Sequence, residues 1–344
     1  ASLALGAAPR RERLLSSALA AWCNRDPLSC LRALRALVAA HPRDLLALEL
    51  LHATLLVFGE AGAMRSTLEA AVHAWDETIP GYAYVLGCLA FARQEVGDYA
   101  AAERAGRRAV ELEPLDAWGG HAVANVMEAQ DRVAEGIAWL RQHQSKWIYC
   151  DSFFGHTTWQ LAIFHVARGE NDEALDLYDT IAAEPDGDYR DLANASTLLY
   201  RLERSGVDVA SRWPALGERA LLRIDDYGSA FAAPHYALAL TGAGLIDEAA
   251  RLCSSIRLYS GRTAGHEALT LREVSLPLAQ AIVSMRDGLP GPAARAFVRV
   301  QPHLPRLGGS RAQRDIFDVL ALDASMDAKD DALARTLIAA RLAA

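Results

Sequence analysis

The chain has 344 residues, 52% hydrophobic and 23% charged, a composition ordinary for a globular or repeat protein with a large buried core. Its formal net charge is −8 and its lysines and arginines form no cluster, which argues against a nucleic-acid partner because phosphate binding needs a basic patch. No apolar run reaches the roughly 18 residues that a membrane-spanning helix needs, so we expect no membrane partner.

The cysteines are odd in number and scattered, and no CxxC pair occurs. We interpret them as reduced thiols within helix packing, in keeping with a cytoplasmic protein. The start, ASLALGAAPRRERLL, lacks an initiator methionine and the hydrophobic stretch of a signal peptide, which predicts a processed or shortened end. The cysteines are Cys23, Cys30, Cys88, Cys150 and Cys253.

Helical periodicity begins near the N-terminus and continues along the chain, whereas the alternation typical of exposed strands is almost absent. Residues 15–42 are the first predicted helix pair, with Cys30 at its small-residue position and Pro42 at its end. The next pair centres on Met64, one repeat further along the chain. This spacing indicates an internal repeat of two helices.

The clearest repeat covers residues 84–114, YVLGCLAFARQEVGDYAAAERAGRRAVELEP. It resembles a tetratricopeptide repeat (TPR), in which small residues let two helices pack closely and GDY is the usual turn between them. Later units match less closely, with GENDEALDLYD in residues 152–185 and LTGAGLIDEAARLC in residues 234–253. The consensus positions in the clearest repeat are Leu86, Leu89, Ala90, Ala102, Ala109 and Pro114.

These repeats predict an all-α fold, a TPR-like α–α superhelix (solenoid) of about seven to nine helix pairs. We expect one continuous domain over residues 1–344, with degenerate spacing after residue 186. The longest connections are predicted at EPDGDYRDL, residues 184–192, and SGRTAGHEALT, residues 260–270.

The repeat register predicts which polar side chains face the inner side of the solenoid, where the first helix of each pair lies. Counting back from Gly136, the small residue of its pair, places His121, Asn125 and Glu128 on this face. We therefore expect four histidines on first helices, directed toward the groove or its wall. The same count in the other pairs adds His52, His156, Trp159, Gln160 and His235.

Six segments carry a more specific resemblance: HPRDLLALELLH, DAWGGHAVANVME, FFGHTTWQLA, GENDEALDLYD, STLLYRLERSGVDVASRW and LGGSRAQRDIFDVL. In this order, over nearly all of residues 8–325, they resemble the tetratricopeptide repeat protein 38 family. The last segment is the most specific, because a generic TPR does not demand LGGSxAQRD. The resemblance implies an architecture more than an activity. It also implies a shortened or diverged member, since the family carries further repeats before this start.

The resemblance also marks polar positions that agree with the family and others that depart from it. Asn125 and Gln160 stand where the family tends to have histidine, and Ala232 and Ala233 stand where it tends to have Asn-Asp. Because these histidines are replaced and Asn is a poor zinc ligand, we expect no tightly bound transition metal. The positions that agree are His52, His121, Glu128, His156, Trp159, His235, Gln313, Arg314 and Asp315.

Several side-chain groups leave alternatives open. The stripe on residues 121–128 suits a metal site, an acid–base group tuned by burial and a neighbouring charge, or hydrogen bonds between helices. Trp118 and Trp159 are either apolar walls beside histidines or core residues. Arg314 either binds a carboxylate or phosphate through two N–H groups of its guanidinium or forms one half of an inter-repeat ion pair. Gly308 and Gly309 suit an anion at a helix N-terminus or simply a tight turn.

We expect a small-molecule enzyme or binder with cofactor-free acid–base chemistry: hydrolysis, isomerisation or carbon–carbon cleavage. GxSxG, P-loop, GxGxxG and kinase signatures are absent from the sequence, which argues against nucleotide-dependent and serine-hydrolase mechanisms. His121 and His156 are the candidate acid–base groups, and Glu128 orients an imidazole. The candidate substrate-binding residues are Trp159, Trp118, Asn125, Gln160, His52, His235, Gln313, Arg314 and Asp315.

The alternative is a non-enzymatic TPR scaffold that binds a peptide or protein partner in its concave groove. A scaffold for acidic peptide tails is expected to show Lys and Arg on the inner face, and here His, Asn, Gln and Trp take those positions. The sequence therefore favours a small-molecule partner over a protein or peptide. It leaves the substrate and the oligomeric state open, a dimer included.

Overall fold

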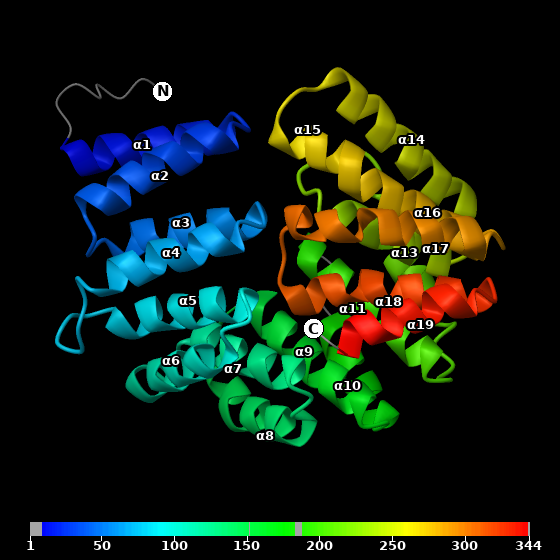
Figure 1. Ribbon diagram of the computed structural model, residues 1–344, viewed down its shortest axis with the longest axis horizontal. Coiled ribbons are helices and arrows are strands. Elements are labelled where there is room, and N and C mark those ends of the chain that lie inside the picture. The colour runs from blue at the N-terminus through cyan, green and yellow to red at the C-terminus, as the bar shows by residue number, and fades with distance from the viewer. Residues whose placement is uncertain (1–8, 151, 183–187, 343–344) are drawn as a thin grey trace. The chain divides into compact units, whose positions relative to one another are not determined.

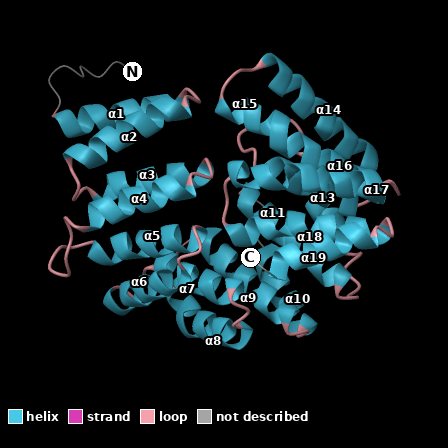
Figure 2. Ribbon diagram, in the orientation of Figure 1, coloured by secondary structure: helices cyan, strands magenta, loops and turns pink. Residues whose placement is uncertain are grey.

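The computed structural model describes residues 9–150, 152–182 and 188–342, and Figure 2 shows that helices are the regular structure throughout these ranges. Consecutive helices pack against each other in pairs (Figure 1). The predicted all-α, TPR-like helix-pair fold is confirmed. None of the helices in the described ranges is long and apolar enough to cross a bilayer.

The chain divides into two compact units, Ala1–Gln130 and Asp131–Ala344. Each unit has its own cluster of buried apolar side chains, from Ala18 to Ala122 in the first and from Trp159 to Leu337 in the second. The expectation of one continuous domain stays a prediction.

The first unit contains three helix pairs in its described part, followed by one further helix, α7. In chain order they are α1 (Arg10–Cys23), α2 (Pro27–Ala40), α3 (Leu45–Val57), α4 (Ala61–Val72), α5 (Tyr82–Glu95), α6 (Tyr99–Leu112) and α7 (Ala117–Ala129).

The second unit begins with α8 (Val133–His143), and five pairs follow in its described part. They comprise α9 (Ser152–Ala167), α10 (Asn171–Ala182), α11 (Tyr189–Arg204), α12 (Trp213–Leu221), α13 (Ala232–Gly242), α14 (Ile246–Arg262), the short α15 (His266–Thr270), α16 (Leu276–Arg286), α17 (Pro290–Val300), α18 (Arg311–Asp327) and α19 (Asp331–Leu342).

The turn of the clearest repeat shows how the sequence sets a helix boundary. Gly97 has a φ of 84°, a left-handed conformation that favours glycine, and it ends α5. Asp98 then caps α6, because its carboxylate accepts the backbone N–H of Ala101. The predicted GDY turn therefore lies where the sequence places it.

The small-residue positions used for the register are buried where helices meet. Ala102, Ala174 and Ala249 are all fully buried. Gly136 lies against the Phe164 ring of α9, and a Cβ at this position would overlap that ring. Close helix packing thus explains why a glycine stands in this register position.

The connection predicted at residues 260–270 is wrong. Helix α14 continues to Arg262, and α15 begins at His266 and passes through a π-helical turn, Leu271–Ser275, into α16. Leu271 and Val274 are fully buried, so tertiary packing keeps this stretch helical despite its glycines. At the other predicted connection, α11 already begins at Tyr189, and residues 184–187 lie outside the described residues. Residues 183–185, at the end of the repeat predicted at 152–185, also lie outside the described residues.

Polar contacts between neighbouring pairs recur at a separation of about one repeat. Trp75 donates its indole N–H to the carbonyl of Pro42, 33 residues earlier. Arg212 pairs with Asp179, also 33 residues earlier, and Asn125 bonds to a side chain 31 residues before it. These contacts link successive pairs within each unit.

Candidate functional site

The predicted site residues of the first unit lie in a polar cluster between α3, α5 and α7. On α7, His121 is buried, and its Nε2 lies 3.1 Å from the Asn125 amide nitrogen. The same amide donates to Oε1 of Gln94 on α5 at 3.3 Å. Glu128 is half-buried near the C-terminal end of α7. His121 and Asn125 are therefore joined by hydrogen bonding as the helical spacing suggests.

Aromatic rings enclose this cluster. Trp118 donates its indole N–H to Nε2 of the buried His52 at 3.0 Å. The Phe91 ring contacts both side chains, at centroid distances of 4.8 Å and 5.7 Å, and the His121 ring stacks on it. Burial lowers the pKa of His52 to about 3, so this imidazole is neutral at pH 7 and accepts the indole proton.

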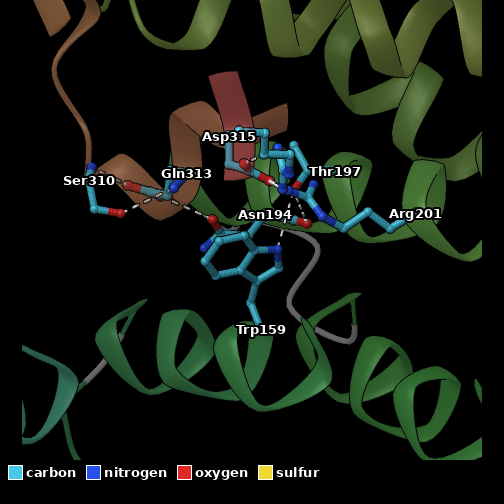
Figure 3. Close-up of polar contacts among 8 residues, drawn as sticks. Trp159, Asn194, Thr197, Arg201, Ser310, Gln313 and Asp315 are labelled. Carbon is cyan, nitrogen blue, oxygen red and sulfur yellow. Dashed lines mark hydrogen bonds and ion pairs between the residues drawn. The ribbon is translucent and has the colours of Figure 1, made fainter. Parts of the chain in front are cut away.

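A second polar cluster joins three helices of the second unit (Figure 3). Asn194 on α11 bonds to Nδ1 of His156 on α9 at 3.2 Å. Its carbonyl accepts the side-chain amide of Gln313 on α18 at 3.1 Å. Gln313 in turn accepts the backbone N–H of Ser310, and Ser310 Oγ accepts the backbone N–H of Gln313, which closes a capping box.

Trp159 lies inside this cluster and is only 1% exposed. Its indole N–H donates to Thr197 Oγ1 at 3.2 Å, as Figure 3 shows, and its ring stacks with His156 at a centroid distance of 5.3 Å. Gln160 beside it is fully buried. The structure therefore places both residues in the packing around α9 and α11, the core position that the sequence left open for Trp159.

Asp315 connects two arginines. Its carboxylate accepts Nη2 of Arg201 at 2.9 Å and lies 2.6 Å from Nη1 of Arg341. Burial raises the pKa of Asp315, but the two guanidinium groups outweigh burial and the net pKa is lowered. Sequence reasoning missed Arg201, because an ion pair across 114 residues leaves no local signal.

Arg314 points back to the turn before its own helix. Its Nη1 donates to the carbonyl oxygens of Gly308 and Gly309. These glycines have φ of 76° and 71°, and a Cβ at Gly309 would lie 2.7 Å from the Phe231 ring. The tight turn considered in the sequence analysis therefore accounts for the two glycines.

His235 lies on α13 between the rings of Phe231 and Phe317, at centroid distances of 4.4 Å and 5.3 Å. Its Nδ1 is 2.7 Å from the carbonyl oxygen of Phe231. Burial lowers the pKa of His235 to about 4. This imidazole, like that of His52, is neutral at physiological pH.

His52 lies on α3, His121 on α7, His156 on α9 and His235 on α13, and all four are buried, while their predicted direction toward the groove or its wall stays a prediction. Their roles in catalysis or binding stay predictions, as do those of the other candidate residues. Within the part of the chain that the structure describes, no three His, Cys, Asp or Glu side chains come together as a metal site.

The second unit also has an open groove of about 540 Å³ that the sequence analysis did not identify. Two ion pairs line it, Arg204 with Asp323 at 2.5 Å and Arg286 with Glu203 at 3.0 Å. The lining residues are Tyr200, Glu203 and Arg204 of α11, Met285 and Arg286 of α16, and Asp323, Met326 and Asp327 of α18. Register arguments missed it because these residues lie at the C-terminal ends of their helices.

No family model matches the chain. Among solved structures, a tetratricopeptide repeat protein from Parabacteroides merdae is similar, with 13% identity and a TM-score of 0.42 over 91% of this chain and 99% of that one.

Proposed function

We propose that this protein is a helical-repeat scaffold that binds a polypeptide segment of a partner in the groove between α11, α16 and α18. One observation carries the proposal: every residue that lines the groove belongs to the first helix of its pair. First helices that share a face form the extended binding surfaces of helical-repeat proteins.

The chemistry of the groove supports binding. The Tyr200 hydroxyl donates to Asp323 at 2.8 Å, and the Arg286 guanidinium lies over the Tyr200 ring at 5.8 Å. These contacts hold the groove wall in place before a partner arrives, which lowers the entropic cost of association. Met326 is 57% exposed at its edge and offers an apolar contact.

The acid–base enzyme expected from the sequence stays a prediction, and so does membership of the tetratricopeptide repeat protein 38 family. Burial lowers the pKa values of His52 and His235, two of the predicted substrate-binding residues, to about 3 and 4, so neither imidazole offers a positive charge to a ligand at pH 7. The lining of the open groove contains no imidazole or thiol. These observations favour the scaffold.

A display library of random linear peptides tests the proposal on the full chain. Selected peptides should bind about tenfold more weakly to a Met326→Gln variant, because the apolar contact at the groove edge is lost. Leu258→Gln is the matched control, since Leu258 is 54% exposed on α14, away from the groove lining, and should bind like the wild type. A library that yields no binder, or binders indifferent to Met326→Gln, contradicts the proposal.

A further inference from the structure

We propose, building on the scaffold function, that the bound segment carries a Lys or Arg next to an apolar side chain. The basic group pairs with Asp327, and the apolar side chain packs between Met285 and Met326. The partner is therefore a cationic, apolar polypeptide segment rather than an acidic tail.

The charges of the groove favour a cation. Three carboxylates and two guanidinium groups line it, and both guanidinium groups already pair with carboxylates of the groove, Arg204 with Asp323 and Arg286 with Glu203. Asp327 is exposed and has no ion-pair or hydrogen-bond partner among the described residues. An incoming ammonium or guanidinium group supplies the missing counter-charge.

Asp327 is also unfavourable for its own helix. It is the last residue of α18, where the helix dipole disfavours a negative charge. Asp323 lies one turn before it, and like charges four residues apart repel each other. A carboxylate that weakens its own helix and faces a groove is typical of a functional position.

The methionines supply the apolar part of the surface. Two of the four methionines in the chain, Met285 and Met326, line this groove from different helices. Flexible thioether side chains adapt to apolar partners of varied shape. The Tyr200 ring is buried beside them. An apolar side chain flanked by a cation therefore matches both features of the groove.

Three labelled peptides test this inference by fluorescence anisotropy on the full chain. Each is acetylated and amidated, with an X-Leu-X core in Gly-Ser flanks, and X is Lys, Gln or Glu. The Lys peptide should bind the wild type at least tenfold more tightly than the Glu peptide, and higher salt should reduce the difference.

Reversing the charge of Asp327 tests whether this residue causes the preference for the Lys peptide. Asp327→Lys should reverse the order of the Lys and Glu peptides, and Asp327→Asn should abolish the preference without reversing it. Glu218→Lys, an equal charge change on an exposed residue in the last turn of α12, should leave the order unchanged. Asp327→Lys should melt at or above the wild-type temperature, because it removes a repulsion within α18.

The outcomes separate this inference from the scaffold proposal. If the Glu or Gln peptide binds as tightly as the Lys peptide and loses affinity in Met326→Gln, the cationic partner is wrong and the scaffold stands. If Glu218→Lys reverses the order as Asp327→Lys does, the preference reflects overall charge and the inference is wrong. If all three peptides bind Met326→Gln as they bind the wild type, both proposals are overturned.

Discussion

Arg314 and Asp315 are neighbours in the sequence that have different structural tasks. Arg314 holds the turn before α18 through the carbonyls of Gly308 and Gly309. Asp315 balances the charge of Arg201, which is only 9% exposed. A buried cation without its counter-charge is costly, so we expect Asp315 to matter more for stability than its exposed partner Arg341 does.

Replacing Asp315 with Asn should lower the free energy of unfolding by about 3 kcal/mol, because the buried Arg201 loses its only carboxylate contact in the described structure. Arg341→Gln should cost about 1 kcal/mol or less, since that side chain is half-exposed and screened by solvent. Urea unfolding of both variants measures the difference. Equal losses would show that Arg201 finds another counter-charge.

The sequence predicted which candidate residues lie together on one helix, but it did not predict the residues on other helices that bond to them. The helical period alone joins His121 to Asn125, and the repeat register places four histidines on first helices. Asn194 and Thr197 were not predicted, although they bond to His156 and Trp159. Their partners lie 38 residues away, and a helical period carries no information about contacts between helices.

At the scale of single elements, α7 begins at an N-cap residue, Asp116, whose carboxylate is buried. Its carboxylate caps the helix through the backbone N–H of Gly119 at 3.1 Å and is almost completely buried. A Cβ at Gly87 of α5 would overlap this carboxylate, so the glycine makes room for it. Burial raises the pKa of Asp116 to about 7.

This raised pKa predicts a pH dependence of stability. Between about pH 4 and 7 the folded state holds a proton on Asp116 while the unfolded state does not, so the free energy of unfolding should fall as pH rises over this range and level off above about pH 7. Asp116→Asn keeps a capping side chain and removes the titration. Urea unfolding measures the free energy of unfolding of both proteins at about pH 5 and pH 8. Relative to the wild type, Asp116→Asn should be more stable at the higher pH than at the lower. If the difference in the free energy of unfolding between the two proteins were the same at both pH values, folding would not raise the pKa of Asp116.

The boundaries of other elements were not all readable from the sequence. Residues 260–270 contain two glycines and suggest a loop, yet helix occupies most of them. Leu271 and Val274 project into the core directly after this stretch. Local propensity therefore predicts a break, and burial of neighbouring side chains overrides it.

At the scale of the whole molecule, each unit carries its own hydrophobic cluster. The second cluster runs from Trp159 to Leu337, entirely within residues 131–344. A fragment of these residues should keep its helical circular dichroism and unfold cooperatively on its own, because it retains that core. A fragment without cooperative unfolding would instead support the single continuous domain expected from the sequence.

The polar contacts that recur at a separation of one repeat suggest an order in which the helix pairs fold. Helix pairs joined across about 33 residues close short loops, so pairing can spread along the chain with little entropic cost. The groove depends on a different closure, since Tyr200 bonds to Asp323 across 123 residues. Such a long loop closes late. The groove is therefore complete only when α18 has docked, and if it binds a partner as proposed, a nascent chain cannot engage that partner before nearly all of the second unit has been synthesised.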